Sequence, residues 1–236
     1  METTPYLASS NYKVMIKSRK RPFKTNAWIH VYKRRKDKFL LFYTTRDFLV
    51  YYTMFSCLAR KHHIRALGLC IMVDHVHELL KADSKKDLEL FEKELNSRFA
   101  REWNQGHKTK GQCFGPYGSA LKIGDKAKRT CVAYLANNPV ERHICNQAEH
   151  YKWNFILPLF KTSDNNLSDI LKFRHQCIEA LCKRGRFLTY PVLENLAKGL
   201  SDADMKKMIN QIINTYDIFD RSEERRVGKE CRSRWS

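Results

Sequence analysis

Residues 64–81, IRALGLCIMVDHVHELLK, decide the fold that this sequence predicts. The first ten residues of the stretch are mostly apolar, which is typical of a buried strand. Asp74 marks a turn, and residues 76–81 continue in an extended pattern. The stretch therefore predicts two extended segments joined near Asp74, with His75 and His77 beside the joint.

The chain before and after this stretch alternates between strand and helix patterns. Residues 27–33, AWIHVYK, alternate with a period of two and predict a strand. A helical spacing of apolar residues begins at Thr45. Ser84 followed by Asp87 resembles a helix-capping signal, and an apolar stripe runs on to Phe99. These patterns predict a strand and a helix before residues 64–81 and a helix after them.

The remaining segments complete the predicted fold class. Residues 111–119 form a connection that contains glycines, and a helix is expected over about 127–138, where Pro139 is expected to end it. From residue 167 the pattern is helical throughout, in three segments. The order predicts an α+β fold, in which helices cover a small antiparallel sheet and an all-α appendage follows.

Charge is distributed unevenly along the 236 residues. The formal net charge is +19, of which +15 lies in the first 160 residues. Folding brings these positive charges close together, so they repel one another, and a polyanionic partner would offset the repulsion. The run Lys33, Arg34, Arg35 and Lys36 is the densest cluster. We therefore expect the first 160 residues to bind nucleic acid, chiefly through contacts with phosphates.

Several classes of protein are disfavoured by composition. A hydrophobic content of 43% supports a folded core, so disorder is excluded for most of the chain. The longest apolar stretch is far shorter than the roughly 20 residues that span a bilayer, so we expect no membrane partner. The basic N-terminus lacks the apolar stretch of a secretory signal. Eight cysteines without regular spacing indicate reduced thiols, hence a cytoplasmic protein.

The His75-x-His77 pair is the first candidate for chemistry. Residues i and i+2 of a strand point to the same face, so both imidazoles can converge on one ion. Such pairs also arise by chance, and a lone histidine is usually structural. Two histidines leave most of a coordination shell open, which suits a catalytic cation that also holds a phosphate oxygen. Glu78 would face away from the pair on an ideal strand, so we exclude it as a ligand.

A second candidate segment is residues 122–142, KIGDKAKRTCVAYLANNPVER. Tyr134 and Asn138 lie four residues apart and share a face of the predicted helix. A helical tyrosine is usually a packing residue, but this one follows a group of cations suited to binding phosphates. They are Lys122, Lys126, Lys128 and Arg129.

Together these motifs resemble those of the single-tyrosine transposases of the His-hydrophobic-His (HUH) nuclease superfamily. The similarity is to insertion-sequence transposases and REP-associated tyrosine transposases of bacteria. It rests on residues 72–80, MVDHVHELL, on residues 133–142, AYLANNPVER, and on Tyr151, Lys152 and Trp153. The sequence departs from the common pattern at Val73 and Asp74, where Pro-Asn often precedes the first histidine.

The resemblance implies a ferredoxin-like HUH fold and a specific reaction. Tyr134 matches the nucleophile that attacks single-stranded DNA at hairpin-bearing ends and remains attached as a 5′-phosphotyrosine. His75, His77 and Asn138 match the ligands of a divalent ion, Mg²⁺ or Mn²⁺. In the insertion-sequence branch a homodimer pairs the histidines of one chain with the tyrosine of the other, whereas the REP-associated branch need not.

The resemblance also suggests a division of the chain. We expect a basic N-terminal arm over residues 1–25, a catalytic domain over 26–160 and a helical region over 161–220. Residues 221–236, RSEERRVGKECRSRWS, resemble the translation of a sequencing-library adapter. We therefore expect this tail to be non-native and its removal to change neither folding nor cleavage.

Two other functions remain open at this point. A replication initiator or relaxase of the same superfamily would stop at nicking, although no glycine-rich phosphate loop of a helicase is present. A non-catalytic protein that binds nucleic-acid hairpins could use the same basic fold. The intact set of histidines, tyrosine and asparagine favours the enzyme.

Overall fold

The computed structural model describes residues 21–35, 40–156 and 167–220. The predictions for residues 1–20, for Lys36 and for the tail over 221–236 lie outside these residues, as does the predicted boundary at residue 160. Four strands of the described part form one antiparallel sheet in the order β2-β3-β1-β4. They are β1 (Trp28–Arg34), β2 (Arg65–Ile71), β3 (His75–Lys81) and β4 (Gly118–Lys122).

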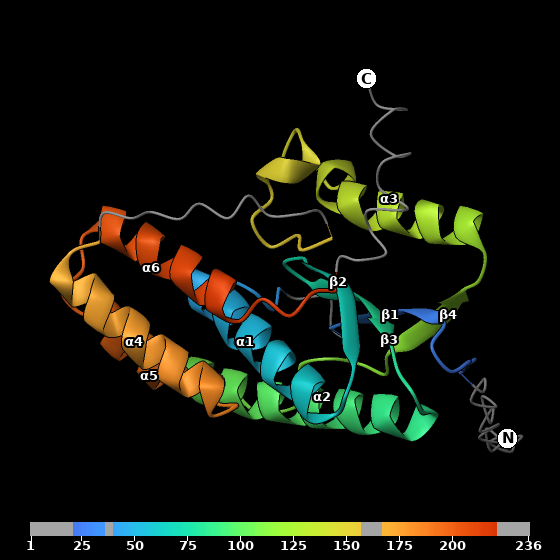
Figure 1. Ribbon diagram of the computed structural model, residues 1–236, viewed down its shortest axis with the longest axis horizontal. Helices are drawn as coiled ribbons and strands as arrows, with labels where there is room; N and C mark the ends of the chain where they lie inside the picture. Colours follow the sequence, from blue (N-terminus) through green and yellow to red (C-terminus); the bar gives the residue numbers. More distant parts are fainter. Residues whose placement is uncertain (1–20, 36–39, 157–166, 221–236) are drawn as a thin grey trace, which may run out of the picture.

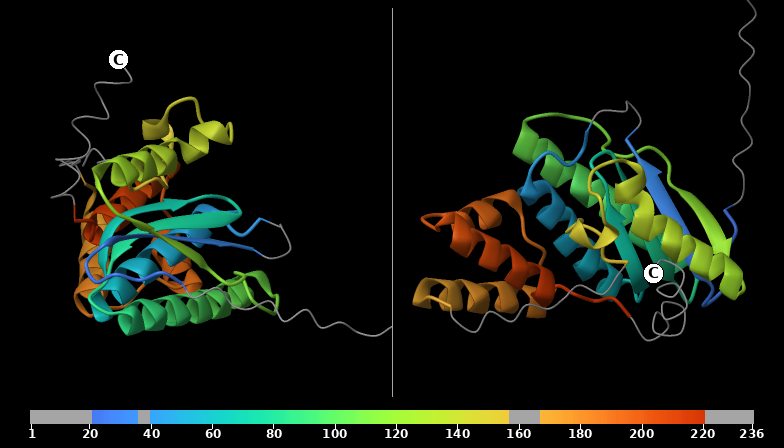
Figure 2. Two further views of the ribbon diagram at one scale, coloured as in Figure 1. Left: turned by 90° about the vertical axis from the view of Figure 1, so that its right-hand side faces the viewer. Right: turned by 90° about the horizontal axis from the view of Figure 1, so that it is seen from above.

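Helices cover both faces of the sheet, as the predicted α+β class requires. Helices α1 (Thr45–Lys61) and α2 (Lys85–His107) pack on one face, and α3 (Asp125–Glu141) crosses the other (Figures 1 and 2). The predicted cap of α2 is present, because the Ser84 hydroxyl accepts a hydrogen bond from the backbone N–H of Asp87 at 3.1 Å. The α+β fold class is therefore confirmed.

The C-terminal helices pack beside α1, away from α3 (Figure 1). They are α4 (Asp169–Lys183), α5 (Tyr190–Ala197) and α6 (Asp202–Thr215). The hydroxyl of Tyr52 in α1 donates to the carbonyl of Ile213 in α6 at 2.8 Å. The Phe155 ring stacks on Tyr52 at 4.5 Å and on Phe219 at 5.5 Å between ring centroids. The helical region thus shares its hydrophobic core with the sheet.

Strand β4 was not predicted, because part of it lies in the segment expected to be a connection. Its five residues are all half-buried and show no alternation of polar and apolar side chains. Gly118 pairs with Tyr32 of β1. A Cβ at this position would lie 2.1 Å from the Tyr32 ring, so any larger residue would displace the exposed Tyr32 side chain, which lies over Gly118.

The predicted end of the third helix was wrong, because α3 continues through Pro139 to Glu141. Proline lacks the N–H that would bond to the carbonyl of Leu135. The side-chain amide of Asn154 approaches that carbonyl at 3.5 Å and donates to the carbonyl of Ala136 at 2.9 Å. This donor, which is distant in sequence, satisfies the last turns of α3 and lets the helix pass through the proline.

Replacing Asn154 with alanine is expected to lower the free energy of unfolding by about 2 kcal/mol, because buried carbonyls lose their donor. Asn154 is 2% exposed, so water does not readily replace the amide. Urea denaturation would measure the change. Asn137→Ala is the matched control, since Asn137 is a half-buried asparagine of α3. Equal destabilisation by both variants would contradict this role for Asn154.

Candidate active site

Strand β3 presents its two histidines to the side of the sheet that α3 covers. Successive residues of a strand point to opposite faces, so His75 and His77 share one face and Glu78 takes the other. Glu78 accepts a hydrogen bond from the Tyr51 hydroxyl and pairs with Lys33 at 2.8 Å, on the side of α1 and α2. The predicted orientation of Glu78, away from the histidines, is confirmed.

Helix α3 brings Tyr134 and Asn138 to the same place. The Asn138 Oδ1 atom lies 3.3 Å from His75 Nε2. The Tyr134 ring lies 5.6 Å from the His77 ring between centroids, in an edge-on arrangement. Tyr134 is 43% exposed, whereas Asn138 is buried. The four residues singled out in the sequence therefore meet in one site, and all four come from the same chain.

Asp74 fixes the orientation of the His75 ring. Its Oδ1 atom lies 2.5 Å from His75 Nδ1, and its Oδ2 atom lies 2.8 Å from the Arg34 guanidinium. Partial burial opposes the charge of Asp74, but the hydrogen bond from His75 and the charge of Arg34 hold the pKa of Asp74 below its ordinary value. In the tautomer whose Nδ1 proton is donated to Asp74, His75 Nε2 faces Asn138 as an acceptor.

A third histidine, which the sequence analysis did not single out, joins the site from β1. His30 Nε2 lies 3.0 Å from His77 Nδ1, and the His30 ring lies 6.3 Å from the Tyr134 ring. Burial, followed by the positive charge of Lys122, lowers the pKa of His30 to about 4. Burial, followed by the electrostatic influence of His75, His30, Arg34 and Arg142, lowers the pKa of His77 to about 3. Both rings are therefore neutral at pH 7.

These atoms fit a divalent cation. His77 Nε2 is buried and makes no hydrogen bond within the described residues. His75 Nε2 and Asn138 Oδ1 face one another as two acceptors, and a cation between them would satisfy both. The described residues contain no cluster of three or more His, Cys, Asp or Glu side chains suited to a metal, so a third protein ligand would come from another residue type, and the Asn138 amide oxygen lies beside His75. Such a set leaves coordination positions open for a substrate oxygen.

Cations line the approach to Tyr134. Lys122 and Lys126 border a cavity of about 750 Å³ together with His30 and Tyr134. Lys128 lies on the neighbouring turn of α3, with its Nζ atom 5.4 Å from the centre of the Trp28 ring. Arg129 is half-buried on the same helix.

The predicted DNA contact by Lys33 is wrong. Lys33 is 1% exposed, and its Nζ atom lies 2.8 Å from carboxylate oxygens of both Glu78 and Glu92. Burial opposes the charge of Lys33, but the two carboxylates hold the pKa of Lys33 above its ordinary value. The next residues along the run differ, since Arg34 reaches Asp74 and Arg35 lies 4.9 Å from the Trp103 ring. Lys33 belongs to a buried ion cluster on the face opposite the histidines.

No helix within the described parts of the chain has both the length and the apolar character needed to cross a membrane.

Comparisons with known proteins agree with this geometry. The family model described as "Transposase IS200 like" matches residues 23–138, a span that contains all four site residues. A REP-associated tyrosine transposase, solved bound to a REP hairpin, has a similar fold with a TM-score of 0.51 and 15% sequence identity. That similarity covers 66% of this chain and 96% of the other. A search of curated proteins found no match. Residues 23–138 of this chain therefore match the family of IS200-like transposases.

Proposed function

We propose that this protein cleaves and rejoins single-stranded DNA at hairpin-bearing ends, with Tyr134 as the nucleophile. One observation carries the proposal: the exposed Tyr134, which borders a cavity with Lys122 and Lys126, lies beside His77, and His75 of the same strand faces the Asn138 amide oxygen. The related fold of a REP-associated transposase, which was solved with a REP hairpin, supports a hairpin as the DNA partner.

In the proposed reaction the Tyr134 oxygen forms a bond to phosphorus as the bond to the 3′ oxygen breaks. One proton leaves the phenol, and one is taken up by the departing 3′ oxygen. The products are a 5′-phosphotyrosine and a free 3′-hydroxyl. Because the phosphodiester is exchanged rather than hydrolysed, the reverse attack by a 3′-hydroxyl can rejoin DNA without an external energy source.

His75, His77 and Asn138 would hold Mg²⁺ or Mn²⁺. Such an ion supplies Lewis-acid polarisation of the scissile phosphate and stabilises the charge that develops in the transition state. Asp74 and His30 orient the two imidazoles from behind, and Lys122 and Lys126 attract the DNA backbone. Tyr134 and the histidines meet within one chain, so a single protomer has the groups that the reaction needs.

The test is incubation with a labelled hairpin oligonucleotide that carries single-stranded flanks, with Mn²⁺ and then with a chelator. A covalent protein–DNA band on a denaturing gel that requires Mn²⁺ supports the proposal. A 5′-phosphotyrosine linkage is identified when a label 3′ of the break stays in this band and a label 5′ of the break is released. Salt-sensitive binding without this band would instead support a non-catalytic hairpin-binding protein. Nicking without rejoining would favour an initiator or relaxase.

Replacing His30 with alanine is expected to weaken Mn²⁺ binding by about 10- to 100-fold, because His77 loses the group that orients its ring. Isothermal titration calorimetry would measure the affinity. The same variant is expected to recover cleavage at high Mn²⁺ concentration, and His30→Gln, whose amide oxygen can accept from His77 Nδ1, should restore part of the affinity. An activity loss in His30→Ala that excess Mn²⁺ does not relieve would contradict this positioning role.

A further inference from the structure

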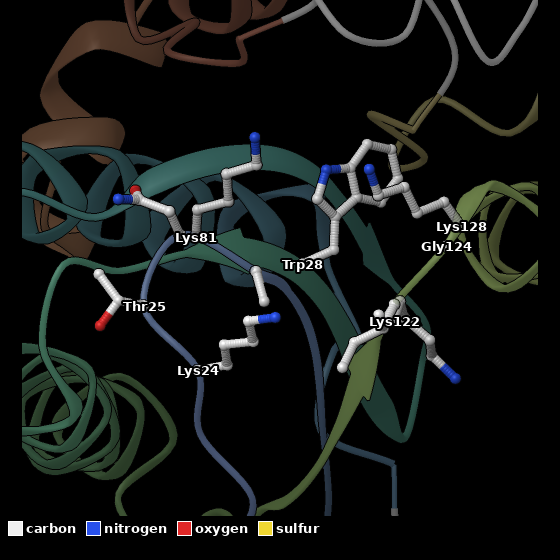
Figure 3. A pocket seen from close by; sticks show the side chains of 10 residues that line it. Lys24, Thr25, Trp28, Lys81, Lys122, Gly124 and Lys128 are labelled. Carbon is white, nitrogen blue, oxygen red and sulfur yellow. The ribbon is translucent and has the colours of Figure 1, made fainter.

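A second basic cavity lies at the far end of the same sheet face. Its volume is about 350 Å³, and it is bordered by Trp28, Gly124 and four lysines (Figure 3). We call this cavity the lysine pocket. Its four lysines come from separate parts of the chain: Lys24 before β1, Lys81 at the end of β3, Lys122 at the end of β4 and Lys128 in the first turns of α3.

The register of the sheet explains why the lysines converge. Trp28 of β1 pairs with Lys122 of β4. The pairing of Ile29 with Leu80 places Lys81 of β3 level with Trp28 on its other side. A cross-strand row thus carries one lysine on each side of a buried indole. Lys128 adds a third ammonium group from above, 5.4 Å from the centre of the indole ring.

No acidic side chain borders this cavity. Asp125 is the acidic neighbour that the structure pairs with Lys128, at 3.9 Å, and its side chain is 76% exposed. Lys24, Lys122 and Lys128 place like charges close together, which raises the free energy of the folded state, and a bound anion lowers it. The 17-residue helix α3 also begins here, directly after Gly124. No side chain caps its first N–H groups, and these groups add positive potential.

The lysine pocket adjoins the cavity at Tyr134, because Lys122 and Ile123 border both. His77 and Lys81 lie on the same face of β3, four residues apart, which is roughly 13 Å along a strand. A DNA strand whose scissile phosphate lies at Tyr134 can therefore pass Lys122 and reach the lysine pocket a few nucleotides away.

We propose that the lysine pocket is a subsite for an internucleotide phosphate of the DNA strand that the active site cleaves. This inference rests on the proposed function and adds to it a second, fixed point of attachment for the strand. Trp28 is 3% exposed and is not available to stack on a base. The pocket therefore recognises the backbone and not the sequence, and it holds the strand in register with the tyrosine.

The first test compares two double variants. Lys24→Gln/Lys128→Gln removes two lysines of the pocket, and Lys198→Gln/Lys206→Gln removes two exposed lysines of the helical region. Fluorescence anisotropy with a labelled single-stranded oligonucleotide is expected to give about tenfold weaker binding for the pocket variant alone. The slope of log K against log salt should also fall by about 0.7 for the lost phosphate contact. Equal affinities and slopes for the two variants would overturn the inference.

The second test replaces single phosphates of the oligonucleotide with neutral methylphosphonates. For the wild type, a methylphosphonate at one linkage outside the scissile position should strongly weaken oligonucleotide binding. The same methylphosphonate should not change the affinity of the pocket variant, Lys24→Gln/Lys128→Gln. If no linkage loses its effect in that variant, the pocket does not bind the strand. Should the double variant prove unstable in a thermal melt, Lys24→Gln alone serves the same comparison, because Lys24 is exposed and precedes β1.

Failure of this inference and failure of the proposed function give different results. A covalent adduct in the wild type, with unchanged DNA binding by the pocket variant, would overturn the subsite and leave the chemistry intact. Absence of any adduct, with weakened binding and a silent linkage in the pocket variant, would overturn the chemistry and leave the subsite intact.

Discussion

Replacing Tyr134 with phenylalanine is expected to abolish the covalent protein–DNA adduct while DNA affinity stays within about twofold of wild type. The substitution removes the oxygen that would attack phosphorus and keeps the ring. The edge-on contact with His77 and the contact with His30 are ring contacts, so phenylalanine preserves them. The hydroxyl group makes no hydrogen bond to another described residue, and the thermal midpoint should therefore change little.

The matched control is Tyr43→Phe, a change of the same chemistry at another exposed tyrosine. Tyr43 is 53% exposed and contacts Trp103 and His107, on the other side of the sheet from α3. Denaturing gels with Mn²⁺ should show the adduct for the control at wild-type yield and none for Tyr134→Phe. An adduct that survives in Tyr134→Phe would assign the nucleophile to another residue and would refute the proposed mechanism.

The sequence predicted the histidine pair and its partners well because their spacing is local. Two histidines separated by one residue share a face of any strand, and Tyr134 and Asn138 share a face of any helix. That the two faces meet follows from β3 lying beneath α3, which the sequence supported only through resemblance to a family. The structure supplies this contact directly, as the 3.3 Å between His75 and Asn138.

Residues whose role depends on a partner elsewhere in the chain were the ones missed. His30 reaches His77 because β1 and β3 are neighbours in a particular register, which periodicity does not reveal. Lys33 lies two and four residues after Val31 and Ile29, so it shares their buried face of β1. This alternation already indicated that Lys33 points inward. Its neutralising partner Glu92 lies 59 residues away, so the composition of the run alone suggested an exposed cation.

The same reasoning explains the end of α3. Pro139 is a reliable stop signal only if the carbonyl of Leu135 has no other donor. Asn154 provides that donor from a segment beside β2, where Phe155 N–H donates to the Leu69 carbonyl at 2.7 Å. The helix therefore extends three residues past Asn138, whose side chain faces His75.

Replacing His77 with alanine is expected to abolish cleavage and to leave most of the DNA affinity. His77 would contribute Nε2 to the metal, and few ligands hold that ion. DNA binding, in contrast, is spread over many cations, so the loss of one neutral ring changes it little. Calorimetry should show Mn²⁺ affinity at least 100-fold lower, and anisotropy should show an oligonucleotide affinity within about threefold of wild type.

His77 is buried, so the variant has to be compared with one that tests folding. His77→Gln fills most of the same space without an imidazole, and a thermal midpoint near that of wild type would show that lost cleavage is not lost structure. His150→Ala, at an exposed histidine, should retain full activity and Mn²⁺ affinity. If cleavage and DNA binding fall together in both His77 variants while folding is intact, the ring contacts DNA directly, and separate metal and DNA roles are refuted. If cleavage alone is lost, the reaction depends on His77 Nε2. This atom is buried beside Tyr134 and makes no hydrogen bond to another described residue.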